Sequence, residues 1–154
     1  MDKSKYNTII TDILENGGVT LSPLTLLSPS YTPNLWMIGG ATDEIHIDMD
    51  YHQRDENRDA LDKLRDEIVE LDNKVSLLSF GYFEGIEVEG VYFGGWRYIK
   101  DELDLIIFEG AYGVRDTYQA ISLAKRLNQL EIYHLGLKQY LSIKKLEELM
   151  GGLS

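Results

Sequence analysis

The residues from Glu44 to His52, with the sequence EIHIDMDYH, alternate between apolar and polar side chains. Successive side chains of a β-strand point to opposite faces, so the polar members of this segment would share one face. These polar members are His46, Asp48, Asp50 and His52. Imidazole and carboxylate groups are common ligands of catalytic metal ions. A small metal-dependent hydrolase built on these four residues is therefore one hypothesis for the function.

The spacing of a strand limits this hypothesis. Side chains two residues apart on one strand face are about 6–7 Å apart, so His46 and Asp48 could share an ion. Four ligands in a row could not do so without a bend, and His134 is the remaining histidine that could complete a site. The simpler interpretation is that the four polar groups face water. We therefore assign no metal, no cofactor and no catalytic residue, and keep the hydrolase as an alternative.

A second set of carboxylates follows in the segment from Arg54 to Asp72. On a helix, at about 100° per residue, four of them fall within roughly 60° of Asp55 and form with it a row about 22 Å long. This row, here called the acidic stripe, consists of Asp55, Asp59, Asp62, Asp66 and Glu70. The opposite side of the same helix carries Leu61, Leu64, Ile68 and Leu71. The pattern predicts a helix over residues 55–72 with a buried apolar face.

Neighbouring carboxylates of the acidic stripe would be about 5–6 Å apart, which lets the row stand in for the phosphates of a nucleic acid. Such a surface would attract a basic protein at rates that fall as salt rises. A solvated helix without a partner would show the same pattern. We predict a partner-binding surface made of the acidic stripe together with Asp48, Asp50 and the aromatic anchor Trp96.

The overall charge points the same way. The chain of 154 residues has 26 acidic and 15 basic side chains, a net charge of −11, and residues 43–72 alone contain 12 acidic and 4 basic ones. This charge disfavours direct binding to nucleic acid or to an anionic membrane, so the expected partner is a basic protein surface, such as a nuclease. The chain has no cysteine, no signal-peptide pattern and no apolar run of the roughly 20 residues that span a bilayer. A cytoplasmic location is the simplest expectation.

The predicted elements form a single domain over residues 1–154. Apolar spacing predicts helices over 3–15 and 55–72, while capping residues Asp116 and Ser142 predict two more toward the C-terminus. Strands are predicted at 34–41, 44–50, 103–109 and 130–135, with a turn near Ala41. The glycine-rich and aromatic segment from Phe80 to Tyr98 predicts a β-meander, and its glycines match no phosphate-binding loop. The expected fold is α+β, with about four helices on one face of a mainly antiparallel sheet.

The C-terminal part contains LDLIIFEG at 103–110 and DTYQAISLAKRLNQLEIYHL at 116–135, and the chain opens with KYNTIITDILENGGVTLS at 5–22. In these segments the chain resembles small acidic proteins carried by phages and conjugative elements of low-GC Gram-positive bacteria. Several proteins of that class antagonise host defence by binding restriction or CRISPR nucleases, some of them as nucleic-acid mimics. The resemblance implies an anti-defence inhibitor and carries over no functional residue.

The leading hypothesis is therefore a non-enzymatic acidic binding protein, an inhibitor of the anti-CRISPR or anti-restriction kind that acts on a nucleic-acid-handling host protein. An immunity protein that caps a basic nuclease toxin is the alternative within the same class. The metal-dependent hydrolase is the alternative from another class.

Overall fold

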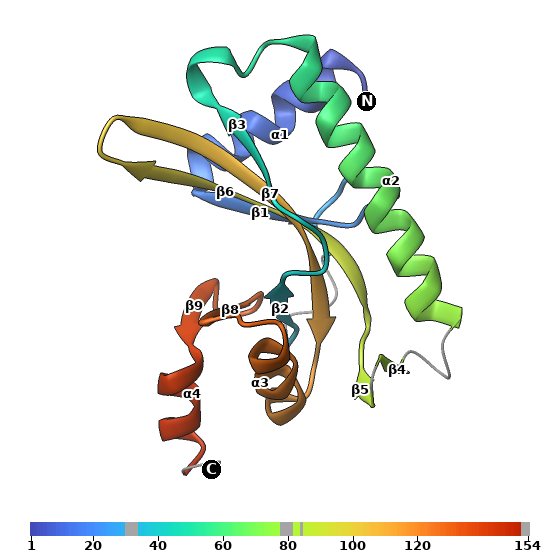
Figure 1. The fold of residues 1–154 in the computed structure, drawn as a ribbon, viewed down its shortest axis with the longest axis vertical. Helices are drawn as coiled ribbons and strands as arrows, with labels where there is room; N and C mark the ends of the chain where they lie inside the picture. Colours follow the sequence, from blue (N-terminus) through green and yellow to red (C-terminus); the bar gives the residue numbers. More distant parts are fainter. Residues whose placement is uncertain (30–33, 78–81, 84, 152–154) are drawn as a thin grey trace.

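A single antiparallel sheet organises the chain, and the helices lie against one of its faces (Figure 1). The computed structural model describes residues 1–29, 34–77, 82, 83 and 85–151. Within them, the main sheet has seven strands in the order β1-β6-β7-β2-β8-β9, with β3 paired to β7, and β4 and β5 form a separate pair. The predicted α+β fold is confirmed.

The strands are β1 (Gly18–Leu21), β2 (Trp36–Gly39), β3 (Ile45–Asp48), β4 (Tyr82–Phe83), β5 (Ile86–Glu87), β6 (Gly90–Lys100), β7 (Leu103–Val114), β8 (Glu131–His134) and β9 (Gln139–Ser142). The α-helices are α1 (Lys3–Asn16), α2 (Asp55–Leu77), α3 (Thr117–Arg126) and α4 (Ile143–Leu149), and η1 (Met49–Tyr51) is a short 3₁₀ helix.

The helix ends follow from capping residues. Asp116 accepts a hydrogen bond from the backbone N–H of Gln119 at 2.9 Å, and Ser142 accepts one from the N–H of Lys145 at 3.0 Å. Both residues therefore begin the helices that the sequence predicts. At the other end of α1, Gly17 has a φ of 84°, a left-handed conformation that glycine adopts without strain.

Helix α2 is the longest helix of the described residues and lies across the sheet. Leu61, Leu64 and Ile68 are buried on its inner side, as the sequence predicts, and Leu71 is partly buried. Arg65 ties α2 to the segment after β1, because its guanidinium donates hydrogen bonds of 2.7 Å to the carbonyls of Pro23 and Leu24. The helix is therefore held along its length by both apolar and polar contacts.

The two strands expected on either side of Ala41 are present, but they do not pair with each other. Strand β2 pairs with the end of β7, and β3 pairs with its beginning, so both lie along the same edge of β7. Between them the chain stays attached to the backbone of Gly110 in β7 through two hydrogen bonds. The N–H of Ala41 donates to the carbonyl of Gly110 at 3.1 Å, and the N–H of Gly110 donates to Oγ1 of Thr42 at 2.8 Å.

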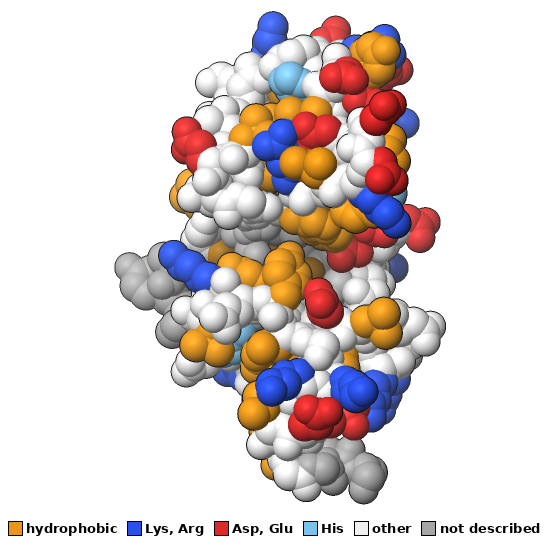
Figure 2. Space-filling model, turned by 90° about the vertical axis from the view of Figure 1, so that its left-hand side faces the viewer, with side chains coloured by type: hydrophobic (Ala, Val, Ile, Leu, Met, Phe, Trp, Pro, Cys, Tyr) orange, Lys and Arg blue, Asp and Glu red, His pale blue; other side chains and the backbone are white. Residues whose placement is uncertain are grey.

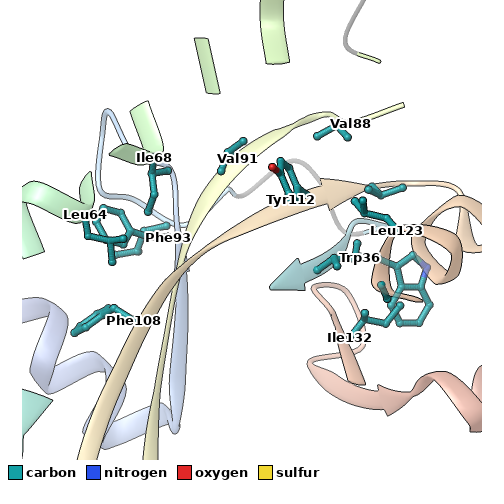
Figure 3. Packing of buried hydrophobic residues seen from close by; sticks show 14 of the residues in the cluster. Trp36, Leu64, Ile68, Val88, Val91, Phe93, Phe108, Tyr112, Leu123 and Ile132 are labelled. Carbon is teal, nitrogen blue, oxygen red and sulfur yellow. The ribbon is translucent and has the colours of Figure 1, made fainter. Parts of the chain in front are cut away.

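The core lies between the helices and the face of the sheet that carries Phe93 and Phe108 (Figure 3). Their ring centroids are 6.4 Å apart in an edge-to-face arrangement, next to Leu64 and Ile68 of α2. The same cluster continues to α3 and β8, where Trp36 donates its indole N–H to Oγ1 of Thr117 at 3.1 Å. One apolar layer therefore joins all four helices to the sheet.

Replacing Leu64 by Ala should lower the free energy of unfolding by about 2–5 kcal/mol, because its side chain is 3% exposed and the change leaves a cavity beneath α2. Urea denaturation followed by circular dichroism measures the effect. The matched control is Leu130→Ala at a leucine that is 83% exposed, which should change stability by about 0.5 kcal/mol or less. Equal effects of the two substitutions would contradict the packing described above.

Candidate functional site

The segment EIHIDMDYH does not remain a strand to its end. Strand β3 stops at Asp48, and η1 follows at once. A carboxylate oxygen of Asp48 accepts a hydrogen bond from the backbone N–H of Asp50 at 2.9 Å, which turns the chain after the strand. The expectation that the alternation continues to His52 is therefore wrong. His46 and Asp48 share a strand face, whereas Asp50 and His52 lie beyond the turn.

His52 and His134 each make contacts of their own. Nδ1 of His52 lies 2.7 Å from the carbonyl of Met49, and Nε2 lies 2.9 Å from the side-chain amide of Gln53. His134 packs edge-on against Trp36 at 4.5 Å on the helix-covered side, and burial lowers its pKa. Within the part of the chain that the structure describes, no three His, Asp or Glu side chains are grouped so that they could hold a metal ion. The four-residue metal site of the hydrolase alternative is not assembled.

The acidic stripe lies on α2 as the sequence predicts, but its members differ in accessibility. Four of them are exposed, namely Asp55, Asp59, Asp66 and Glu70. The side chains of Asp55 and Glu70 are 84% and 71% exposed, and they pair with Arg58 and Lys74 of the same helix. Ion pairs between exposed side chains are weak and readily exchanged for other partners. The stripe is therefore open to a second molecule along most of its length.

Asp62, the central member of the stripe, has a different environment. Both of its carboxylate oxygens accept hydrogen bonds of 2.7 Å from the ammonium group of Met1, and the carboxylate is partly buried. This contact joins the start of α1 to α2. Asp62 is thus a structural link in this protein. Of the two acidic residues predicted to extend the surface, Asp50 is exposed and Asp48 is partly buried.

Trp96, the predicted anchor, lies in β6 opposite Ile107 of β7 and Gly18 of β1. It is partly buried, on the face of the sheet opposite the helices. Phe80, the first aromatic residue of the predicted meander, lies outside the described residues. The side chain of Trp96 is therefore partly covered by its neighbours on this face and does not stand free in solvent.

The face that the described helices leave uncovered is here called the open face. The strand register places on it Tyr92, Trp96 and Tyr98 of β6, Ile107, Glu109 and Ala111 of β7, His46 of β3, Met37 of β2, Tyr133 of β8 and Tyr140 of β9. Leu35, Met37 and Ala111 form a small buried cluster there, against which Tyr92, Tyr133 and Leu135 pack. The open face thus combines an apolar floor with tyrosine side chains.

The surface charge is divided between two halves of the molecule. Figure 2 shows acidic side chains concentrated in the upper half, which contains α1, α2 and the β6–β7 hairpin, and hydrophobic patches in both halves. Residues 110–154, which contain α3, α4, β8 and β9, have 4 acidic and 6 basic side chains. The acidic residues are concentrated in one segment of the sequence. They are therefore also concentrated in one part of the folded protein.

Glu109 occupies the break between β2 and β3. One carboxylate oxygen accepts a hydrogen bond from the N–H of Gly40 at 3.2 Å, and the other lies directly over Gly39, where a Cβ atom would clash with it. The amide oxygen of Gln129 is 3.1 Å from the same Cβ position. Burial first, and then the nearby carboxylate of Glu44, raise the pKa of Glu109 to about 7 despite the hydrogen bond from Gly40.

Two tyrosines, on β8 and β9, form a ring pair on the open face. The rings of Tyr133 and Tyr140 are 4.9 Å apart and inclined at 53°. Desolvation against the sheet, together with Tyr133, Glu109 and Glu131, raises the pKa of Tyr140 to about 12. Because Tyr140 is nevertheless 57% exposed, one side of its ring remains in contact with solvent.

The site residues predicted from the sequence do not include Glu109, Tyr133 or Tyr140. A signal for Glu109 was present in the sequence, because this carboxylate interrupts the apolar residues of every second position in β7, namely Leu105, Ile107 and Ala111. No comparable signal identified the tyrosines, since their proximity depends on the pairing of β8 with β9. Comparison with family models, with curated proteins and with solved structures gives no match to this chain. None of the described helices combines the length and the apolar character needed to cross a membrane.

The ionisation of Glu109 should make folding depend on pH. The folded protein retains this proton up to a pKa of about 7, whereas the unfolded chain releases it near the ordinary value of 4.5. The folded state therefore binds more protons between these values, and the free energy of unfolding should fall as pH rises through this window. Glu109→Gln should remove this component, because the amide oxygen can still accept from Gly40 but does not ionise.

Urea titrations at several pH values between 4.5 and 8 measure this difference. Glu102→Gln, at an exposed carboxylate in the turn between β6 and β7, is the control and should keep the pH dependence of the unmodified protein. A pH profile that Glu109→Gln leaves unchanged would show that Glu109 is ionised normally in the fold.

Proposed function

We propose that this protein is a non-enzymatic acidic binding protein that attaches to a basic surface of a partner protein through α2. The observation that carries the proposal is the row of exposed carboxylates on the outer side of this helix, Asp55, Asp59, Asp66 and Glu70. The inner side of α2 is fixed by buried leucine and isoleucine side chains. A surface held in place before binding loses little conformational entropy when the partner arrives.

The spacing of the row supports a particular class of partner. Its exposed members follow one another at intervals of four, seven and four residues, and the row extends about 22 Å at a rise of about 1.5 Å per residue. Proteins that bind nucleic acid present lysine and arginine side chains over comparable lengths to contact successive phosphates. The inferred partner is therefore a nuclease or another nucleic-acid-handling protein, whose binding surface α2 would occupy.

This partner class agrees with an inhibitor of the anti-CRISPR or anti-restriction kind, which the resemblance to acidic phage and mobile-element proteins suggests. An immunity protein for a basic nuclease toxin would use the same chemistry. Electrostatic complementarity of this kind mainly accelerates association and excludes partners of like charge. The binding experiment described next therefore compares several nucleases.

Neutralising the exposed row should slow association with such a partner. The test variant contains Asp55→Asn, Asp59→Asn, Asp66→Asn and Glu70→Gln, and it keeps Asp62 because of its contact with Met1. Surface plasmon resonance against a restriction endonuclease, a Cas9-type nuclease and a basic nuclease toxin should identify a partner of the unmodified protein. For that partner, the association rate should fall about tenfold or more and depend less on salt.

The matched control removes four charges elsewhere, by Glu15→Gln, Glu87→Gln, Glu102→Gln and Glu148→Gln, all at exposed positions. It changes the net charge equally, so it should slow association far less than the α2 variant if position matters. Duplex DNA should compete with the unmodified protein for the nuclease. Equal rates for the two variants, or binding to the nuclease that DNA leaves untouched, would reject the proposed function.

A further inference from the structure

Strand β3 has one edge that no other described strand covers. It pairs with β7 along one side, and its other side pairs with no strand of the described residues. We propose that this free edge binds an extended basic segment of a partner protein, which joins the sheet as a further antiparallel strand. This inference rests on the proposed function in one respect, namely that the partner is a basic protein. It concerns backbone groups of β3, so each proposal can fail without the other.

The strand pairings show which backbone groups of β7 face β3. The N–H of Gly110 donates to Oγ1 of Thr42, and its carbonyl accepts from the N–H of Ala41. Both groups of Gly110 therefore point to the side of β7 where β2 and β3 lie. The backbone groups of residues two apart in a strand point the same way, so those of Phe108 and Ile106 also face β3.

The same alternation identifies the backbone groups at the free edge. Ile45 and Ile47 are the register partners of Phe108 and Ile106, so they make the hydrogen bonds to β7. The N–H and the carbonyl of His46 consequently point away from β7. Within the described part of the chain no hydrogen bond engages them, and His46 is exposed. Unpaired backbone groups at a strand edge are a template for pairing with another chain.

The side chains beside this edge determine the character of the incoming segment. Glu44 and Asp48 stand on either side of His46 in the sequence, and Asp50 follows after the turn. On the helix-covered face, Ile45 packs against the core but stays partly exposed. Directly opposite side chains of paired strands lie about 4.5–5.5 Å apart. Lysine or arginine near the carboxylates, alternating with an apolar residue near Ile45, would therefore complement both faces of the edge.

A second copy of the chain is a poor occupant of this edge. Antiparallel pairing of two β3 strands about His46 would place Glu44 of one copy opposite Asp48 of the other, and like charges opposite each other destabilise a sheet. The net charge of −11 on each copy adds a general repulsion. A basic segment reverses the sign of both interactions.

The edge of β9 at the end of the sheet has the opposite character. Lys138 comes just before β9, Lys144 and Lys145 come just after it, and all three are exposed. A basic segment would be repelled there. Charge therefore favours β3 over β9 as the edge to which such a segment adds.

The free edge is close in the chain to the acidic stripe. Strand β3 ends at Asp48 and α2 begins at Asp55, and Ile47 belongs to the same core cluster as Leu61 of α2. Figure 1 shows β3 and α2 in the same half of the molecule. A partner bound to the first turns of α2 would therefore have a neighbouring extended segment within reach of β3.

The test uses the peptide acetyl-Val-Lys-Val-Arg-Val-Lys-Val-amide and two N-methylated forms with the same charge. In an antiparallel pair, the basic residues that share a face with His46 would point their N–H groups at β3. N-methylation of the central arginine should therefore weaken binding about tenfold, since it blocks a hydrogen bond to the edge. N-methylation of the next valine, whose N–H points away from β3, should leave binding nearly unchanged. Equal binding by the two methylated peptides would overturn strand addition.

Hydrogen exchange locates the bound peptide. Titration of the ¹⁵N-labelled protein should shift the amide signal of His46 in a saturable way, and its exchange with solvent should slow, because this N–H becomes hydrogen-bonded. Shifts confined to α2, with no protection of His46, would show that the peptide binds only the acidic stripe and would overturn the inference.

Proline substitution tests the same bond from the side of the protein. His46→Pro removes the outward N–H, a change that edge strands tolerate, and should weaken peptide binding about tenfold. His46→Ala keeps the N–H and should bind better than His46→Pro. The matched control is Tyr140→Pro on β9. Because Ile143 donates to Leu130 of the chain before β8, the alternation directs the N–H of Tyr140 to the free edge of β9. This control should bind like the unmodified protein.

Circular dichroism checks that each variant is folded. Unchanged peptide binding by folded His46→Pro would contradict the inference. If this variant does not fold, the methylated peptides still test the bond in the unmodified protein.

The carboxylates beside the edge are tested by Glu44→Gln combined with Asp48→Asn, in which the amide oxygen of residue 48 can still accept from Asp50. Peptide binding should weaken about fivefold and depend less on salt. The matched control removes two exposed charges elsewhere, by Glu87→Gln and Glu102→Gln, and should have a smaller effect. Equal losses in the two variants would contradict a local role of these carboxylates.

Sedimentation equilibrium of the unmodified protein without peptide tests the other occupant. The protein should be monomeric. An oligomer that His46→Pro dissociates would show that a second copy covers the edge, and would overturn the inference.

The two proposals give distinct patterns of failure. If the peptide leaves His46 unprotected while the α2 variant loses the nuclease, the inference is wrong and the proposed function stands. If the peptide protects His46 but neutralising α2 leaves nuclease binding intact, the proposed function is wrong and the inference stands. In the four-fold α2 variant, the peptide should still protect the amide of His46.

Discussion

The pairing of β6 with β7 is the interaction on which the rest of the structure depends. The register runs without interruption from Gly90 opposite Gly113 to Lys100 opposite Leu103. Every other strand of the main sheet is attached to this hairpin directly or through one or two neighbours, and helices α1 and α2 pack on its buried face. The hairpin also positions both candidate surfaces, because α2 packs on its buried face and β3 pairs with the outer edge of β7.

Strand β7 shows how a long strand can place a polar group within an apolar surface. On its outer edge it pairs with two short strands in turn, and the chain between them contacts Gly110 through Ala41 and Thr42. Because β2 ends at Gly39 and β3 begins at Ile45, Glu109 lies beside the irregular chain between these two strands. A carboxylate at this position is shielded from much of the solvent and receives a backbone hydrogen bond from the chain at the break.

Local patterns in the sequence predicted the features that depend on nearby residues. The apolar spacing of α2 and the caps at Asp116 and Ser142 are all determined within one or two turns of a helix. The turn after Asp48 was missed, although aspartate often bonds to the backbone two residues on. Strands β1 and β9 were also missed, since each is defined by its pairing with a neighbouring strand, β1 with β6 and β9 with β8.

Contacts between distant segments could not be predicted in this way. The alternation around His46 indicated a strand but not its partner, and both β2 and β3 pair with a strand far along the chain. The acidic stripe was predicted correctly as a helix face, whereas the link between Asp62 and Met1 depends on how α1 packs beside α2. The position of Glu109 over Gly39 and the ring pair of Tyr133 and Tyr140 both depend on pairings between strands, so local patterns could not predict them.

The contact between Glu109 and Gly39 has a consequence for the evolution of this fold. Any side chain at position 39 would occupy the place of the carboxylate. Because the carboxylate is the end of a flexible side chain, a lineage with a larger residue at position 39 could keep Glu109 only by moving its carboxylate away from this place beside Gly40, and a lineage that loses Glu109 would be free to vary at position 39. The two positions, distant in the sequence, should covary as a pair.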